Sequence, residues 1–232
     1  MRKSLFAGLT IMLCLLMSAP AYAWGAKKKT IHVTPDNASI YIDGAKVGEG
    51  SYTVKIDGDF VMVKLKADGY LDATYKLEKD YPEKTILYQM DKDEALAAST
   101  GADGEGEDSG LDIANRWFDV TCRKGLTGDQ IWRRLMNIVI SNFDDVEVRD
   151  KAAGWIKTGW KTTNFAKQAV RTRMEVRMSF IDDDQVSYRV RLESQIKKRD
   201  CRGSQCYQKF NYILKKFTPL ISELQTTVGG GE

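Results

Sequence analysis

Between residues 30 and 90, apolar and polar side chains alternate in short runs that are separated by turn residues. The runs follow one another at a spacing of roughly ten residues, at 31–33, 39–42, 52–56, 60–65, 74–77 and 85–88. Turn-forming Asp-Gly dipeptides stand at 43–44, 57–58 and 68–69. Because a period of two is typical of half-buried strands, this segment predicts a small antiparallel β-sandwich.

The second half of the chain mixes strand and helix periods. A strand is predicted at 117–122, and Thr127 with Gln130 has the spacing of a capping box. Ile131 and Leu135 open a helical repeat that we expect to end near Asn142. Further elements are predicted as strands at 145–150, 154–161, 169–181 and 185–196, then a helix at 206–226 that Pro219 kinks or splits.

The two longest predicted strands each have one apolar and one polar face. Their inward-facing series is predicted to contain Val170, Thr172, Met174, Val176, Met178, Phe180, Val186, Tyr188, Val190, Leu192 and Ile196. The element order is therefore β-α-β-β-β-β-α, a sheet covered by helices on one face. We expect the fold class to be mainly β plus α+β.

Composition and charge divide the chain further. It has 232 residues, of which 43% are hydrophobic and 29% charged, with a net charge of +3. This profile is that of an ordinary globular protein and excludes a polytopic membrane protein, a collagen-like chain and a wholly disordered one. Residues 24–90 are electrically neutral, 91–112 carry −7 and 113–232 carry +8. The acidic stretch is rich in Gly, Ala and Ser, which predicts a flexible linker, or a segment that folds back to mask the basic domain.

The N-terminal segment 1–23 has a basic start, an apolar run at 5–17 and a small-residue site for cleavage between Ala23 and Trp24. This pattern predicts a signal peptide, with a retained membrane anchor as the alternative. Leu13 before Cys14 argues against a lipoprotein. We expect a periplasmic or secreted protein with no stable membrane span after cleavage. The expected domains are 1–23 signal peptide, 24–90 sandwich, 91–112 linker, 113–228 α+β domain and 229–232 tail.

The first domain resembles a known family. Its sequence contains the stretches PDNA at 35–38, IYIDG at 40–44, VG at 47–48 and ADGY at 67–70. These stretches resemble the PEGA domain, a small β-sandwich of exported bacterial proteins. The resemblance implies a role in the cell envelope or at the cell surface, and it implies no catalytic residues.

The second domain is similar in arrangement to the helix-grip domains of the BamC-type lipoproteins of the outer-membrane assembly machinery. The residues that carry this similarity are VEVRD at 146–150, GWI at 154–156 and RTR at 171–173. The similarity implies protein–protein contact within the envelope.

The polar side of the predicted sheet is rich in cations, which makes it the candidate partner-binding face. The candidates are Arg171, Arg173, Arg177, Arg189, Arg191, Lys157 and Lys161. Guanidinium groups in rows suit carboxylates and phosphates because they donate paired hydrogen bonds. We expect an envelope protein or an anionic envelope component such as lipopolysaccharide or peptidoglycan, and export argues against nucleic acid. The alternative is a solvated face on which Glu147, Glu175 and Glu193 pair with the cations across strands.

Two tryptophans and three cysteines remain. Trp155 and Trp160 either belong to the core or stack on a sugar. Cys201 and Cys206 can close a disulfide over four intervening residues, which would contribute roughly 2 kcal/mol by loop entropy. The alternative pairs Cys122 with one of these two cysteines.

Catalytic and metal-binding patterns are weak. The single histidine, His32, lies between Ile31 and Val33 and is expected to face solvent, so it builds neither a zinc site nor a triad. The run 182–184 is read as a hairpin tip or a weak cation site. We expect no cofactor, no metal site and no enzymatic activity, and a hydrolase is the least favoured hypothesis. The leading hypothesis is a binding or adaptor module of the envelope, and the alternative is a glycan- or lipid-binding module.

Overall fold

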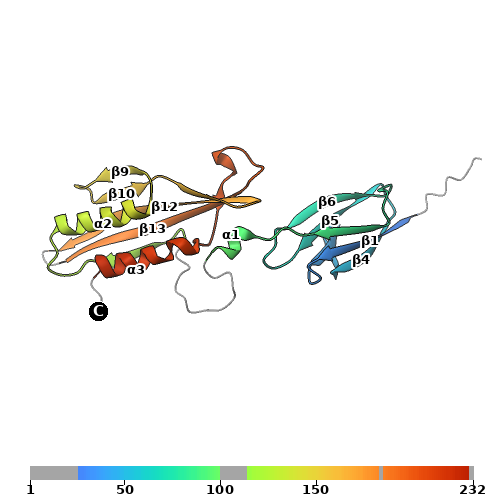
Figure 1. Ribbon diagram of the computed structural model, residues 1–232, viewed down its shortest axis with the longest axis horizontal. Coiled ribbons are helices and arrows are strands. Elements are labelled where there is room, and N and C mark those ends of the chain that lie inside the picture. Colours follow the sequence, from blue (N-terminus) through green and yellow to red (C-terminus); the bar gives the residue numbers. More distant parts are fainter. Residues whose placement is uncertain (1–25, 100–113, 183–184, 230–232) are drawn as a thin grey trace, which may run out of the picture. The chain divides into compact units, whose positions relative to one another are not determined.

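The computed structural model describes residues 26–99, 114–182 and 185–229. Two compact units are present: the described residues up to Ala67 with Asp72–Met90, and Asp68–Leu71 with the described residues from Asp91 on (Figure 1). The predicted signal peptide, its cleavage site at Ala23 and Trp24, and the end of the predicted tail lie outside the described residues. No helix in the described ranges is long and apolar enough to cross a membrane.

The first unit consists of two small sheets. One has the order β4-β1-β7 and the other β3-β2-β5-β6. The strands are β1 (Lys27–Thr34), β2 (Ser39–Ile42), β3 (Ala45–Glu49), β4 (Ser51–Ile56), β5 (Phe60–Lys66), β6 (Ala73–Glu78) and β7 (Thr85–Gln89). Their alternating apolar side chains form the core, with Ile31, Ile40, Ile56, Val63 and Leu65 fully buried. The predicted strands are thus confirmed, and His32 is exposed as expected.

Two features of this unit differ from the prediction. β1 pairs with β7 in parallel, whereas the sandwich was expected to be antiparallel throughout. β3 was not predicted, because its residues AKVGE do not alternate in polarity and none of them is buried. Its place is set by backbone pairing with β2.

The second unit is a single sheet with helices. Its path is β14-β13-β12-β10-β9, with β11 paired to β12 and β8 paired to β13. The strands are β8 (Trp117–Thr121), β9 (Val146–Asp150), β10 (Trp155–Thr158), β11 (Lys161–Asn164), β12 (Gln168–Asp182), β13 (Gln185–Lys198) and β14 (Gln208–Lys209). The long β12–β13 hairpin is its centre, and the α+β expectation is confirmed.

Helices α2 (Gly128–Asn142) and α3 (Thr218–Thr227) both pack on one face of this hairpin (Figure 1). The predicted capping box is present, since the Thr127 hydroxyl accepts from the Gln130 N–H and the Gln130 side chain accepts from the Thr127 N–H. The buried strand residues under the helices are Val170, Thr172, Met174, Val176, Tyr188, Val190 and Leu192. After Met178 the register of the two strands shifts, and Phe180 pairs with Ser187.

The predicted strand at 154–161 is two strands. Lys157 lies opposite Glu175, but Lys161 lies opposite Thr172, so this side of the pairing holds one extra residue. The Met174 N–H donates to the Thr158 hydroxyl in this gap, which ends the backbone pairing of β10 with β12. An extra residue of this kind changes the side of the sheet to which the following positions belong.

The predicted helix at 206–226 is also wrong in its first half. The segment forms the short helix η1 (Ser204–Cys206), strand β14 and the short helix η2 (Lys215–Phe217) before α3 begins. Pro219 lies in the first turn of α3, where a missing N–H costs no hydrogen bond. The apolar residues that resembled a helical stripe, Phe210, Ile213, Leu214 and Phe217, are buried from an irregular segment.

The start of the predicted acidic linker is ordered. It forms the short helix α1 (Glu94–Ala97), in which Ala95 is fully buried. A Glu94 carboxylate oxygen accepts from the Ala166 N–H, and the Ala95 N–H lies 3.4 Å from the Gln168 side-chain oxygen. The first residues of the predicted linker are therefore packed against the rest of the second unit, although their composition is acidic. Residues 100–112 of the predicted linker lie outside the described residues.

Candidate arginine–tryptophan face

The candidate site lies on the face of the β12–β13 hairpin opposite to α2 and α3. We define the arginine–tryptophan face by Arg171, Arg173, Arg177, Arg189, Arg191, Lys157, Trp117, Trp155, Trp160 and Tyr207. Strand alternation places the arginines together, because Arg171, Arg173 and Arg177 are separated by even numbers of residues. β13 adds Arg189 opposite Arg177, and β8 adds Trp117 opposite Arg191.

Lys161 does not belong to this face, contrary to the prediction. It lies opposite Thr172, whose side chain is buried on the helix side. Its Nζ donates to the Asn142 carbonyl at 3.0 Å, at the end of α2, and lies 3.3 Å from the Asp144 carboxylate. The extra residue between β10 and β11 explains the change of side. Lys157, in contrast, is on the face and lies 3.4 Å from Glu147.

Aromatic rings enclose the guanidinium group of Arg171. Its Cζ lies 3.9 Å from the centre of the Tyr207 ring and 4.3 Å from that of Trp160. Both Nε and Nη2 donate to the Gln195 side-chain oxygen, at 2.9 and 2.6 Å. Burial lowers the pKa of Arg171 from its ordinary value. Arg173 lies on Trp160 as well, at 4.3 Å. Cation–π contacts of this kind stabilise both partners.

An ion-pair network fills the middle of the face. The Arg173 Nε donates to Glu193 at 2.6 Å, and Arg191 pairs with Glu193 and also, at 2.7 Å, with Glu175. The Glu175 side chain is only 3% exposed, and the Trp155 Nε1–H donates to it at 3.2 Å. Burial alone would raise the pKa of Glu175, but hydrogen bonds and charges from Arg177 and Arg191 outweigh burial and lower it.

Trp117 is the aromatic centre of the other end of the face. Its ring lies 4.6 Å from the Cζ of Arg191, 5.7 Å from that of Arg177 and 5.8 Å from that of Arg189. Arg177 also lies 5.2 Å from the Trp155 ring. Trp155 is half-buried beside Arg177 and is therefore not a fully buried core residue; its stacking on a sugar stays a prediction.

Sequence reasoning missed Trp117 and Tyr207. Trp117 was placed in a strand, but the pairing of that strand with β13 joins segments about 70 residues apart, which periodicity does not reveal. Tyr207 follows the cysteine pair directly, in a segment predicted as helix. The signal available was compositional: aromatic residues within a stretch of high arginine content.

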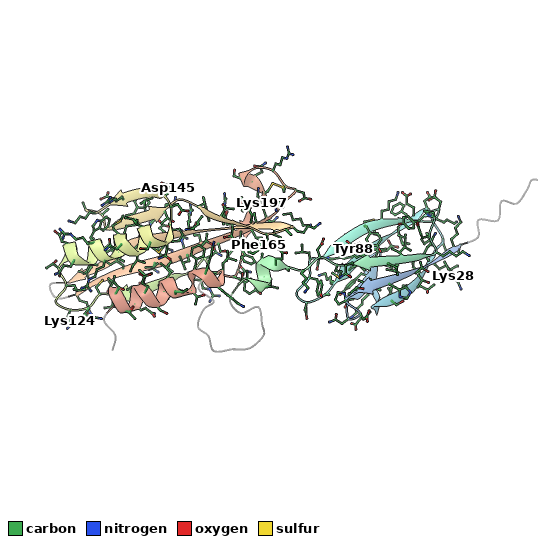
Figure 2. The ribbon with its side chains drawn as sticks, in the orientation of Figure 1. Lys28, Tyr88, Lys124, Asp145, Phe165 and Lys197 are labelled. Carbon is green, nitrogen blue, oxygen red and sulfur yellow. A yellow bond between two sulfur atoms is a disulfide. The ribbon has the colours of Figure 1, made fainter. Side chains whose placement is uncertain are left out.

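The predicted disulfide Cys201–Cys206 is confirmed, and Cys122 is a buried free thiol. Burial raises the pKa of Cys122 to about 11. The disulfide lies before Tyr207 and β14, not before a helix as predicted. Lys197, labelled in Figure 2, donates from Nζ to the Cys201 carbonyl at 3.3 Å and lies 5.1 Å from the Tyr207 ring. The closed loop therefore restrains the ring that covers Arg171.

A groove of about 800 Å³ lies at the far end of this unit, between the start of α2 and the end of the hairpin. Asp129, its one carboxylate among the described lining residues, forms a 2.6 Å ion pair with Lys151. That pairing lowers the pKa of Asp129. No group of three or more His, Cys, Asp or Glu side chains in the described ranges is placed to hold a metal ion. Asp183 and Asp184 of the weak cation site lie outside these ranges.

In the first unit, backbone geometry explains the motif residues. Asp43 and Gly44 both have positive φ at the β2–β3 turn, at 48° and 90°. Gly50 has φ +64°, and a Cβ there would overlap the Asp36 carbonyl.

Residues 29–90 match the PEGA domain family. The predicted resemblance is thereby confirmed for the N-terminal domain. No curated protein matches the chain.

PEGA domains are found in exported proteins. The Cys201–Cys206 disulfide is consistent with the same extracytoplasmic location, since disulfides persist in oxidising compartments. The match at residues 29–90 thus identifies a domain of a kind that occurs in exported proteins. The similarity of the second unit to BamC-type helix-grip domains stays a prediction.

Proposed function

We propose that this protein is a non-enzymatic adaptor of the cell envelope, in which the unit after the PEGA domain binds a partner protein through the arginine–tryptophan face. The observation that carries the proposal is the concentration of Trp117, Trp155, Trp160 and Tyr207 among arginines on a face opposite to both helices. Tryptophan, tyrosine and arginine are the residue types that dominate binding energy at protein interfaces. Location in the periplasm, after removal of a signal peptide at 1–23, is part of the proposal.

A folded protein partner fits this face better than a simple polyanion does. Arg173 and Arg191 already satisfy Glu193 and Glu175, so much of the positive charge is neutralised internally. The accessible surface of the face therefore consists of partly exposed aromatic rings that alternate with guanidinium groups. Such a surface offers apolar contact and hydrogen-bond donors together, as the centre of a protein interface does.

A glycan-binding role, the alternative class, requires aromatic rings with an open face. The rings of Trp117, Trp155 and Trp160 each lie against at least one guanidinium group. These contacts occupy surface on which a sugar would stack, so the protein partner is favoured.

Crosslinking in intact cells tests the proposal. The chain is crosslinked, purified under denaturing conditions, and its covalent partners are identified by mass spectrometry. W160A removes the ring shared by Arg171 and Arg173, and we expect it to lose the partner. I140A is the matched control, because Ile140 is 60% exposed on α2, on the opposite side of the unit.

A defined envelope protein that W160A loses and I140A keeps would support the proposal. Recovery of glycan or lipid without protein would overturn it in favour of the alternative class. A partner captured equally by W160A would place the binding surface elsewhere. The folding of W160A is verified by urea unfolding before the comparison is made.

A further inference from the structure

The arginines of the face differ in how much of each side chain is accessible. The side chain of Arg173 is 19% exposed and that of Arg191 is 28% exposed, whereas Arg177 and Arg189 are 55% and 52% exposed. From this difference we infer that Arg177 and Arg189 form a carboxylate-binding subsite that receives an acidic segment of a partner protein. The inference rests on the proposed function and narrows it to two residues.

Register gives the first argument for the subsite. Arg177 and Arg189 lie directly opposite each other in the β12–β13 ladder. Like charges in directly opposite positions destabilise a pair of strands. Farther along the ladder, Arg173 faces Glu193 and Arg191 faces Glu175, so opposite charges are paired there. The Arg177–Arg189 pair departs from that pattern, and an anion bound between the two guanidinium groups would offset the repulsion between their positive charges.

The donors that remain at this pair give the second argument. Arg177 uses Nε and Nη2 on Glu175. Within the part of the chain that the structure describes, Arg189 forms one ion pair, between its Nε and the Asp119 carboxylate at 3.5 Å. The Asp119 side chain is itself 68% exposed. A guanidinium group has five N–H donors in a fixed fork that matches a carboxylate. Most donors of Arg189 and part of those of Arg177 therefore face solvent.

Aromatic rings lie beside both guanidinium groups and restrict their movement on one side. The Trp117 ring lies within 5.8 Å of each Cζ, and the ring of Trp155, on β10, lies 5.2 Å from the Cζ of Arg177. Side chains that are restrained before binding lose less conformational entropy when the ligand arrives. The indole rings also supply apolar contact beside the charged group, which suits the carbon chain of a glutamate or aspartate in a polypeptide.

The surroundings favour an acidic polypeptide over other anions. Carboxylates of Glu147, Glu175, Glu193 and Asp119 are interspersed among the cations. A polyphosphate backbone needs a continuous run of cations and would meet these carboxylates. Membrane binding needs apolar side chains that are exposed enough to enter the bilayer, whereas Trp117 and Trp155 are half-buried. Among the side chains of this unit whose exposure the structure describes, the most exposed large apolar ones, Ile140 and Tyr212, lie on α2 and before η2, away from the subsite.

The test uses the chain from Trp24 onward and a fluorescein-labelled peptide in which two adjacent glutamates stand among neutral residues. Binding is measured by fluorescence anisotropy at two salt concentrations. We expect R177Q/R189Q to weaken binding at least about tenfold, the loss of one charge-assisted hydrogen bond or more. R177K/R189K keeps the charge but loses the fork, so its affinity should fall between the two. The matched control K198Q/K209Q removes two exposed lysines of the same unit and should change affinity by less than about twofold.

Equal binding by R177Q/R189Q and the unsubstituted chain would overturn the subsite. So would equal weakening by K198Q/K209Q, because it would mean diffuse charge attraction. Binding of inorganic phosphate or phosphatidylglycerol vesicles with no binding of the peptide would also overturn it, in favour of another anion. Crosslinking in cells distinguishes failure of the subsite from failure of the proposed function. If R177Q/R189Q still captures the partner of the unsubstituted chain, the subsite alone is refuted. If the unsubstituted chain captures no partner, the proposed function is refuted.

Discussion

Replacing Glu175 with glutamine removes a buried negative charge from the centre of the arginine–tryptophan face. The Glu175 carboxylate receives hydrogen bonds from Arg177 at 2.7 Å, from Arg191 at 2.7 Å and from Trp155 at 3.2 Å. Glutamine has the same shape but presents one oxygen and one NH₂ group to these donors. At least one guanidinium group then faces another donor, and the positive charge of the face is no longer balanced.

The expected cost is about 2 kcal/mol in the free energy of unfolding. Breaking a fully buried ion pair costs about 3–5 kcal/mol, because one charge is left without a partner. Here the carboxylate is 3% exposed but Arg191 and Arg177 are 28% and 55% exposed, so water replaces part of what they lose. For a unit of this size, about 2 kcal/mol corresponds to a fall in Tm of roughly 8 °C.

Urea unfolding followed by tryptophan fluorescence measures this difference in the second unit. Residues 29–90 contain no tryptophan, and four of the five tryptophans of the chain lie at or after residue 117. The measurement is repeated from pH 7 to pH 3. Because the folded state lowers the pKa of Glu175, its carboxylate stabilises the fold above the pKa of the unfolded chain. That contribution is lost as the pH falls through the folded-state pKa, so the gap between wild type and E175Q should close in acid.

E223Q is the matched control. Glu223 lies on the exposed side of α3, and its removal should change the unfolding free energy by less than about 0.5 kcal/mol. The reasoning is refuted if E175Q and E223Q unfold alike at pH 7. It is refuted equally if the deficit of E175Q is the same at pH 3 as at pH 7, because then it does not come from the ionised carboxylate.

Three further changes probe other parts of the chain. Cys122, buried and with its pKa raised to about 11, should resist iodoacetamide at pH 8 until urea unfolds the second unit; alkylation of the folded protein would contradict its burial. T127A removes the hydroxyl that accepts from the Gln130 N–H and should cost about 1 kcal/mol by urea unfolding, and no change would mean that the cap is unimportant. G50A places a Cβ against the Asp36 carbonyl at positive φ and should lower the Tm of the PEGA domain in near-ultraviolet circular dichroism while the tryptophan signal stays unchanged.

Local patterns predicted most of the strands but not the contacts between distant ones. The alternation of apolar and polar residues along β12 and β13 arises because one side of these strands is buried against the helices. The prediction therefore put the polar series, which includes Arg173 and Arg191, on the correct face of the sheet. The extra residue between β10 and β11 is invisible to periodicity, and for that reason Lys161 was assigned to the wrong side. The helix predicted at 206–226 failed because apolar spacing alone does not distinguish a buried irregular segment from a helix.

The tryptophans show a different limit of sequence reasoning. The prediction for Trp155 and Trp160 offered core or stacking on a sugar, and it did not foresee a half-buried indole that lies beside a cation of its own sheet. The cations beside Trp155 and Trp160 come from β12, whereas the pairing of β8 with β13 and the loop closed by Cys201 and Cys206 bring the rings of Trp117 and Tyr207 to the arginines from far along the sequence. Each of these contacts depends on tertiary structure.

The same side chains therefore serve stability and, in our proposal, binding. Arg171, Arg173 and Arg191 hold rings and carboxylates within the unit, so reversing the charge of the whole arginine row would unfold the site together with any partner contact. Arg177 and Arg189 contribute less to that network because they are half exposed. Substitution of Arg177 and Arg189 therefore tests binding with a smaller loss of internal ion pairs, whereas substitution of the buried Glu175, which contacts Arg177 and Arg191, tests stability. Separating the two measurements in this way allows either property to fail without the other.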